Sequence, residues 1–311
     1  MPAAHGNIQV FDRRLVRARR NRRAKEFSDH DFLFREVAER LADRLDDVKH
    51  AFPTALDLGA RDGVMAAALK GRGGVTTLIQ TELAECLAWA ASRRALAVAA
   101  DEEALPFADG SFDLVLSCLS LHWVNDLPGT LAQIRRVLKP DGLLLAALFG
   151  YGTLAELREA FLAAEAAKTG GAGPRVSPFA DLRDAAGLLQ RAGFAMPVAD
   201  ADTINVTYDN AFALMRDLRG MGESNAATLR PRRPLARATL YHTGELYTRR
   251  FAQPDGRVRA RFQVVYLTGW APGEGQPRPL KPGSATARLA DALDGEERPA
   301  GDKAPTRRPR R

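Results

Sequence analysis

Cysteine is scarce in this sequence of 311 residues. Its two cysteines, Cys86 and Cys118, lie far apart and form no C-x-x-C pair. Disulfide frameworks and zinc clusters need several cysteines at short spacings, so neither is expected here. Cys118 is interpreted as a small core residue rather than a nucleophile. With this cysteine usage, a reducing cytoplasm is the default expectation.

Long apolar segments are also missing. The longest run, Leu143 to Phe149, is far shorter than the roughly 18–20 residues that a membrane-spanning helix needs. Hydrophobic residues nevertheless make up 46% of the chain, which is enough for a full core. We therefore expect one large globular domain, or one domain with an insertion, and no transmembrane segment.

No histidine begins an H-x-D or H-x-E pair. A non-haem iron centre usually takes two histidines and a carboxylate as ligands. The five histidines are His5, His30, His50, His122 and His242. Their scatter predicts no metal site, although histidines distant in the sequence can still meet in a fold.

Strands and helices alternate between residues 54 and 149. The expected strands are 54–58, 75–80, 96–100, 112–117 and 143–149, and the expected helices are 32–48, 64–69, 84–94 and 127–138. This order predicts βαβ crossovers and a mostly parallel sheet with both faces covered. The fold class is therefore α/β and Rossmann-like.

The pattern loosens after Gly150. Helices are expected at 154–168 and 179–191, an irregular helical region at 209–252, and two more strands at 196–206 and 261–270. The resulting domains are a basic arm and helix (1–50), a Rossmann-like core (51–150), a helical cap with closing strands (151–270), and a Pro/Gly-rich linker and tail (271–311). Aromatic residues are absent after Trp270, so we expect residues 285–311 to be disordered and dispensable for folding.

The junction of the first strand and first helix carries the sequence Leu56-Asp-Leu-Gly-Ala-Arg-Asp-Gly63. Glycines at such a junction let the backbone approach a ligand, and the helix N-terminus offers free N–H groups. In open α/β sheets ligands bind at the carboxyl ends of the strands. A tight turn without a ligand is the plain alternative for this segment.

Acidic residues follow the next two strands. Glu82 ends the second strand, and a carboxylate there can accept hydrogen bonds from both hydroxyls of a ribose. Asp101 and Glu102 end the third strand, where an acid can accept from an adenine amino group. Each residue alone is typical of a solvated loop, but the three together match an adenosyl ligand.

Four motifs resemble the motif series of class I S-adenosylmethionine (SAM) dependent methyltransferases over about residues 50–150. They are Leu56-Asp-Leu-Gly59, Leu105-Pro-Phe107, Phe112-Asp-Leu-Val115 and Leu138-Lys-Pro-Asp-Gly142. The resemblance implies a seven-stranded fold and SAM as cofactor. It implies that Asp57, Gly59 and Gly63 hold the methionine end.

By the same resemblance Glu82 holds the ribose, and Asp101 holds the adenine. One position departs from the family pattern, since Arg61 replaces the middle glycine of the loop. This arginine either weakens SAM binding or pairs with the SAM carboxylate.

A narrower resemblance covers nearly the whole folded chain. Phe11-Asp-Arg13, Ser120-Leu-His-Trp-Val-Asn-Asp-Leu-Pro128, Ser177-Pro-Phe179 and Gly220-Met-Gly-Glu-Ser-Asn225 resemble the methyltransferase-like assembly factors of respiratory complex I. The mitochondrial member of that family is an arginine hydroxylase acting on an iron–sulfur subunit. A more distant resemblance is to the malonyl-carrier-protein methyltransferase of biotin synthesis. The implied partner is a complex I subunit, with peripheral association to the membrane complex.

The positive charge is concentrated at the N-terminus. Residues 1–25 carry eight basic residues and one acid, which equals the whole net charge of +7, and the chain between this arm and the tail is about −2. A body without excess positive charge predicts no nucleic-acid partner. The arm is either a docking arm for a protein, a solvated helix or a transit peptide. Because the cofactor acids lie elsewhere in the chain, we expect SAM affinity to stay unchanged when five arginines of the arm are replaced by Gln: Arg17, Arg19, Arg20, Arg22 and Arg23.

His122 and Trp123 follow the fourth strand and are the catalytic candidates. A histidine there could act as a base, and the tryptophan could stack on a substrate. A capping histidine over a packed tryptophan is the structural alternative. Residues 222–225 could line the substrate mouth or cap a helix.

Three functions remain open at this point. A methyltransferase releases S-adenosylhomocysteine, an arginine hydroxylase adds oxygen to a protein, and a non-catalytic chaperone tolerates loss of Asp57 and Glu82. Residue spacing does not choose among them.

Overall fold

The computed structural model describes residues 9–274 except 170, 180 and 182–184, together with residue 276. The predicted disorder of residues 285–311 lies outside this range. None of the helices in the described part is both long enough and apolar enough to cross a bilayer.

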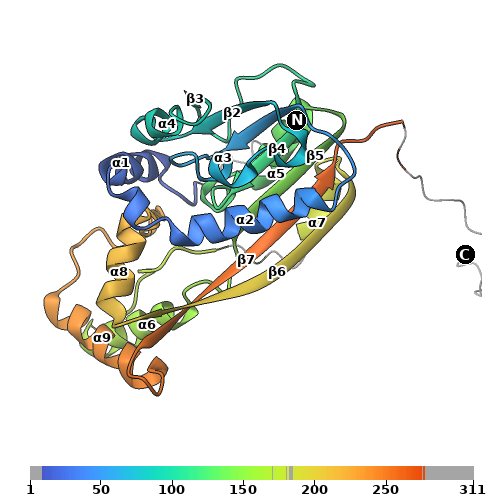
Figure 1. The fold of residues 1–311 in the computed structure, drawn as a ribbon. Coiled ribbons are helices and arrows are strands. Elements are labelled where there is room, and N and C mark those ends of the chain that lie inside the picture. Colours follow the sequence, from blue (N-terminus) through green and yellow to red (C-terminus); the bar gives the residue numbers. More distant parts are fainter. Residues whose placement is uncertain (1–8, 170, 180, 182–184, 275, 277–311) are drawn as a thin grey trace, which may run out of the picture. The chain divides into compact units, whose positions relative to one another are not determined.

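A seven-stranded sheet forms the centre of residues 9–274 (Figure 1). Its strands are β1 Thr54–Leu58, β2 Thr77–Glu82, β3 Leu96–Ala99, β4 Phe112–Cys118, β5 Leu138–Phe149, β6 Ala195–Tyr208 and β7 Val258–Trp270. Their order in the sheet is β3-β2-β1-β4-β5-β7-β6. The first five strands pair in parallel, and β7 runs antiparallel to both β5 and β6. The chain reverses direction across the sheet between β1 and β4, which is where ligands bind in open α/β sheets.

Alternate residues of β5 face opposite layers of the core. Leu143 and Leu145 pack with one buried cluster, whereas Leu144 and Leu148 pack with the other. The first cluster includes helices α2 (Phe32–Asp46), α3 (Val64–Leu69) and α4 (Glu85–Ala91), and the second includes α5 (Leu127–Val137) and α7 (Ala185–Arg191). A strand covered on both faces must be apolar at every position, which explains the uninterrupted run in this segment.

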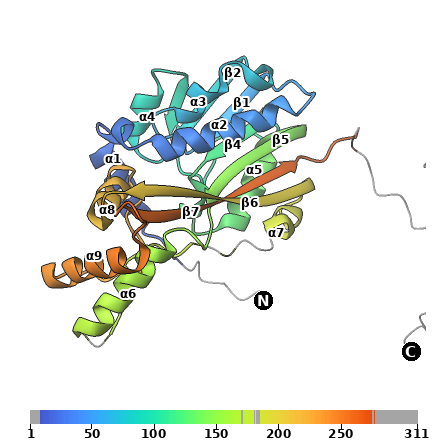
Figure 2. The same cartoon turned by 60° about the horizontal axis from the view of Figure 1, so that its bottom comes forward.

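The remaining helices gather near one end of the long strands β6 and β7. They are α6 (Ala155–Thr169), α8 (Ala211–Gly220) and α9 (Arg237–Phe251). Helices α6 and α9 run side by side (Figure 2). The α/β fold and the seven strands expected from the sequence are therefore confirmed.

The N-terminal basic segment forms a packed helix. Helix α1 (Arg13–Arg23) begins at Asp12, whose side chain accepts from the backbone N–H of Leu15. Val16 and Arg20 are buried, and α1 lies beside α4 (Figure 1). Helix α1 thus has a buried face, with Val16 and Arg20, and an exposed face that carries other arginines.

Three local expectations differ from the structure. The strand expected to close the sheet, β7, lies between β5 and β6 and leaves β6 at the edge. The described helical residues of the segment expected at 179–191 begin at Ala185, whereas Phe179 is buried outside a helix against His122. The strand expected at 143–149 begins earlier, because β5 starts at Leu138, and Asp141 within this added part has a positive φ of 60°.

Candidate functional site

The loop after β1 needs its glycines. Gly59 and Gly63 have φ values of 76° and 90°, which side chains rarely adopt. A Cβ on Gly59 would lie 2.1 Å from Oγ of Ser120. The backbone N–H groups of Gly59 and Ala60 both donate to the carbonyl oxygen of Thr81 at 2.9 Å, which holds this loop against β2.

Asp57 lies next to this loop with its carboxylate fully buried. Neither carboxylate oxygen has a hydrogen-bond partner within the described residues. Burial and the nearby charge of Glu82 raise the pKa of Asp57 to about 8. Burying a carboxyl group without a partner costs free energy, and no donor for Asp57 is found among the described residues.

Glu82 ends β2 and is already engaged on both oxygens. Oε1 accepts from Nη1 of Arg20 at 2.9 Å and from the backbone N–H of Ala84 at 3.1 Å. Oε2 accepts from the backbone N–H of Arg61 at 3.0 Å. The two backbone contacts fix the carboxylate in place, and the arginine neutralises it.

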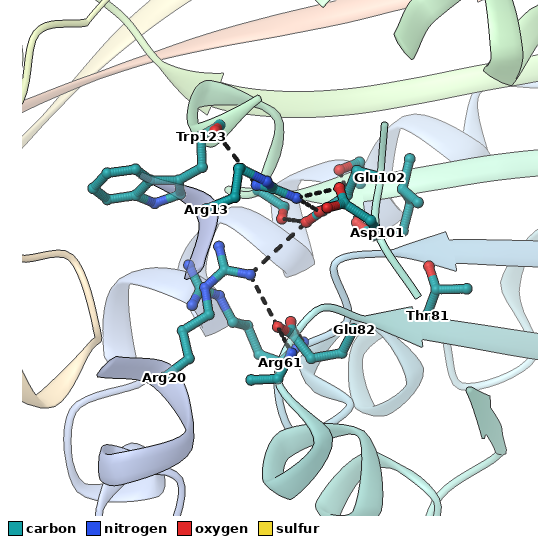
Figure 3. A network of polar contacts seen from close by, with 12 residues as sticks. Arg13, Arg20, Arg61, Thr81, Glu82, Asp101, Glu102 and Trp123 are labelled. Atoms are coloured by element: carbon teal, nitrogen blue, oxygen red, sulfur yellow. Dashed lines mark hydrogen bonds and ion pairs between the residues drawn. The ribbon is translucent and has the colours of Figure 1, made fainter. Parts of the chain in front are cut away.

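Asp101 and Glu102 bind a second arginine of α1 (Figure 3). Nη2 of Arg13 donates to Asp101 Oδ1 at 2.6 Å and also to Oε2 of Glu102. The other oxygen of Glu102 accepts from the Ser120 hydroxyl at 2.5 Å. Burial alone would raise the pKa of Glu102, but Arg13 and Arg20 outweigh it and lower that pKa to about 2.

Helix α1 therefore covers the acids expected to hold the cofactor. The side chains of Arg13 and Arg20 are 11% and 0% exposed, and both point toward the strand ends (Figure 3). Seven positions separate them, which places them on the same face of a helix. The reason given for expecting unchanged SAM affinity, that the cofactor acids lie away from the arm, is wrong for Arg20, because Arg20 contacts Glu82. The spacing of Arg13, Val16 and Arg20 is the signal that could have revealed it.

Arg61 has its partner inside the protein. Its φ is 56°, its guanidinium lies 4.8 Å from the ring centre of Phe34, and Nη2 donates to Oε1 of Glu223 at 2.5 Å. Burial and the neighbouring Arg20 lower its pKa. Arg61, which replaces the usual middle glycine, thus connects the loop to the segment after α8 through its hydrogen bond to Glu223.

Glu223 also binds both catalytic candidates. His122 Nε2 lies 3.0 Å from Glu223 Oε2, and the indole N–H of Trp123 donates to the same oxygen at 3.0 Å. The sequence placed Glu223 only at a substrate mouth or a helix cap. Its partners come from segments about a hundred residues away, so no local pattern could name them.

The charge state of this cluster follows from its surroundings. Burial lowers the pKa of His122, although Glu223 acts in the opposite direction. Burial acts to raise the pKa of Glu223, but His122 and Arg61 outweigh it and lower that pKa to about 2. With Nε2–H donating to an ionised Glu223, the neutral imidazole leaves Nδ1 as a buried acceptor without a partner among the described residues.

The hydrogen-bond acceptors at the strand ends fit an adenosyl cofactor. Asp57 has an unused carboxyl group beside a loop with no room for a Cβ at Gly59, and Glu82 is held by backbone contacts at the end of β2. The remaining acceptor positions of Glu82 and Glu102 are taken by Arg20 and Arg13. The buried acids therefore have the chemistry to bind the hydroxyl and amino groups of SAM, and Arg20 and Arg13 occupy two of them in this structure.

Comparison with known proteins places this geometry in a family. Residues 56–146 match the family model described as a methyltransferase domain. YcgJ from Bacillus subtilis has the same fold, with a TM-score of 0.53 at 17% identity over 76% of this chain and 98% of that one. A methyltransferase-like structure from Bacillus halodurans gives 0.51 at 17% identity, over 74% and 98% of the two chains.

Sequence relatives extend over almost the whole chain. The human mitochondrial arginine-hydroxylase NDUFAF5 is 43% identical over 91% of this chain and 83% of its own. The malonyl-[acyl-carrier protein] O-methyltransferase of Halorhodospira halophila is 39% identical over 86% and 91%. The fold and these matches define a methyltransferase-fold enzyme of the class I SAM-dependent superfamily. Within it, the chain belongs to the family that contains NDUFAF5 and the malonyl-[acyl-carrier protein] O-methyltransferases.

Proposed function

We propose that this protein binds SAM at the carboxyl edge of its sheet and modifies an arginine side chain of a protein. The observation that carries the proposal is the set of buried carboxylates at this edge. Glu82, Glu102 and Glu223 each accept a hydrogen bond from a guanidinium group. Because Glu82 and Glu102 are assigned to the cofactor, Glu223 is the carboxylate of this set that would hold a guanidinium group of a partner.

The cofactor contacts are assigned from the positions of the acids. Glu82 binds the ribose hydroxyls, and Asp101 with Glu102 faces the adenine ring. Asp57 and the backbone at Gly59 and Gly63 hold the methionine end, where the amino group would give the unpartnered carboxylate a donor. SAM, when bound, supplies an electrophilic methyl group.

His122 is the proposed base. Its pKa is lowered by burial, so the ring is neutral near pH 7 and its unpartnered Nδ1 can accept a proton. A guanidinium nitrogen that gains a methyl group must lose a proton, and Nδ1 would take it. Glu223 orients the ring through Nε2, while Trp123 packs against Phe11 and closes this side of the cluster.

Hydroxylation of arginine is the second candidate, because the relative that is 43% identical carries the name arginine-hydroxylase. That reaction inserts one oxygen atom and needs molecular oxygen and two electrons from outside this chain. The third possibility is an assembly chaperone without catalysis. In all three, the partner we propose is a subunit of respiratory complex I, met in the bacterial cytoplasm or at the membrane periphery.

Mass spectrometry of respiratory-chain subunits separates these functions. Subunits from cells with the wild-type protein would be compared with subunits from cells lacking it and from cells carrying His122→Asn. We expect an arginine peptide that carries one extra methyl group only when the wild type is present. An added oxygen atom instead would establish hydroxylation. Identical masses in all three cultures would contradict an enzymatic function.

A further inference from the structure

Two adjoining cavities lined by arginine lie beside the candidate site. The larger, of about 740 Å³, has Asp12, Arg19, Arg175, Arg219, Arg230 and Arg232 as its charged lining residues. The smaller, of about 320 Å³, shares Arg19, Arg219 and Ser224 with the first and adds Arg22 and Arg23. We call the two together the arginine cavity. From α1 it takes Arg19, Arg22 and Arg23, whereas Arg13 and Arg20 contact the acids at the strand ends.

The arginine cavity has more positive charge than its own acids neutralise. Arg175 pairs with Glu165, and Arg230 lies 3.5 Å from Asp12. Three other lining arginines form no side-chain hydrogen bond or ion pair within the residues that the structure describes: Arg22, Arg219 and Arg232. Cations held together without partners repel one another, so an anion would stabilise this cavity.

Arg19 shows the effect of this crowding. Its pKa is lowered by burial first and then by the charges of Arg230 and Arg22. The guanidinium stays in place because Nη1 donates to the backbone carbonyls of Ser224 at 2.8 Å and Asn225 at 2.6 Å. These two hydrogen bonds hold Arg19 against the segment that follows Glu223.

The arginine cavity adjoins the loop that positions the proposed base. Ser224 directly follows Glu223, whose carboxylate contacts His122. Asn225 donates from its side chain to the carbonyl oxygen of Pro174, another residue of the cavity wall. A peptide bound in the arginine cavity would thus contact Ser224 and Asn225, which directly follow the partner of His122, Glu223.

We infer that the arginine cavity binds an acidic stretch of a protein partner. Guanidinium groups match carboxylates through paired hydrogen bonds. Two joined cavities exceed the size of one small anion and suit several side chains of an extended segment. Pro174, Pro231 and Leu235 add apolar wall that a peptide can contact. The binding of an acidic segment stands by itself. That this segment belongs to the protein that is modified rests on the proposed function.

Docking of this kind has a kinetic signature. Complementary charges raise the association rate, and salt screens them beyond about 10 Å at 0.1 M ionic strength. The acidic stretch would bring its own protein to the mouth of the site before any arginine enters it. Binding is therefore expected without SAM and without reaction.

The test uses the full-length protein and a fluorescein-labelled, glutamate-rich peptide. Fluorescence anisotropy would be measured for the wild type and for the variant Arg22→Gln/Arg219→Gln/Arg232→Gln. The control variant is Arg14→Gln/Arg216→Gln/Arg237→Gln, which removes the same charge from exposed positions outside the cavity. Competitors are the matching glutamine peptide, tripolyphosphate and a single-stranded DNA oligonucleotide.

We expect the cavity variant to bind the peptide about tenfold or more weakly than the control, because several charge-assisted contacts are lost. Raising the salt from about 50 to about 500 mM should weaken wild-type binding more than that of the cavity variant. Equal loss in both variants would show a general charge effect and overturn the inference. Tighter binding of tripolyphosphate or DNA than of the peptide would also overturn it. Neither outcome depends on whether the protein modifies arginine.

Discussion

Asp57 is the buried carboxyl group of the candidate site that has no hydrogen-bond partner among the described residues. Its pKa rises from 3.8 to about 8. A carboxyl group whose pKa is raised by folding contributes its stability below pH 4, and this stability is lost as the pH rises toward 8. Asparagine has no such titration.

The variant Asp57→Asn should therefore gain stability relative to the wild type as the pH rises. We expect the difference in Tm, variant minus wild type, to increase between pH 5 and pH 8 by about 5 °C or more. Thermal unfolding without SAM at several pH values measures it. The test is how the Tm difference changes with pH. Burying the asparagine amide has a cost that does not depend on pH, so it shifts all points equally. A flat difference would show that Asp57 is ionised throughout.

His122 depends on Glu223 for its orientation and tautomer. If Nδ1 is the base, His122→Asn should lower the rate of substrate modification by about 100-fold or more while SAM affinity stays within about twofold. His242→Asn, at a histidine of α9 outside this cluster, is the matched control. Substrate turnover by mass spectrometry and SAM affinity by calorimetry are the two readouts. Unchanged turnover in His122→Asn would exclude its role as the base.

At the residue scale the sequence named the acids but not their partners. Glu82, Asp101 and Glu102 could be placed because parallel strands end at one edge of a sheet. Arg13 and Arg20 looked like free charges, since a run of arginines is typical of a solvated face. Glu223 could not be assigned, because its contacts depend on how α8 packs near the sheet.

Helix α1 is the element that links the two charged regions of this molecule. Its inner face neutralises the acids at the ends of β2 and β3, and its outer face borders the arginine cavity. Buried ion pairs hold such a helix firmly only while both partners are present, because an unpaired buried charge costs several kcal/mol, about 3–5. A ligand that takes the acids must therefore loosen α1.

Hydrogen exchange can detect this coupling. On addition of saturating SAM, backbone amides of α1 should exchange faster, about tenfold or more, because Arg13 and Arg20 lose their carboxylate partners. Amides of α2, which packs in the core without these contacts, serve as the internal control. Slower or unchanged exchange in α1 at full SAM occupancy would contradict this prediction. It would mean that Arg13 and Arg20 stay bound to the carboxylates while SAM is bound.

Strand and helix positions were largely predictable because hydrophobic periodicity and turn residues define them locally. Strand β1 matches its expected bounds, and α5 differs from its expected bounds by one residue. The position of β7 was not predictable in this way, since pairing between β5 and β6 depends on contacts distant in the sequence. The spacing of Arg13, Val16 and Arg20 indicates a buried face of α1, but the acids that this face contacts are distant in the sequence.

At the scale of the whole molecule, the chain combines a methyltransferase fold with an acid-rich site that its own arginines neutralise. The fold alone does not choose among methyl transfer, hydroxylation and chaperoning, because all three reuse one architecture. All three proposals share SAM binding at the strand ends. That binding is therefore the central claim of the account.

Isothermal titration calorimetry of the full-length protein with SAM tests this claim most directly. The account predicts saturable binding to the wild type, and affinity about tenfold or more lower in Glu82→Gln, because a charge-assisted contact to the ribose is weakened. Glu85→Gln, which changes an exposed acid of the adjacent helix α4, should bind like the wild type. Absence of saturable binding by the folded wild type, or equal affinities of all three proteins, would contradict the account.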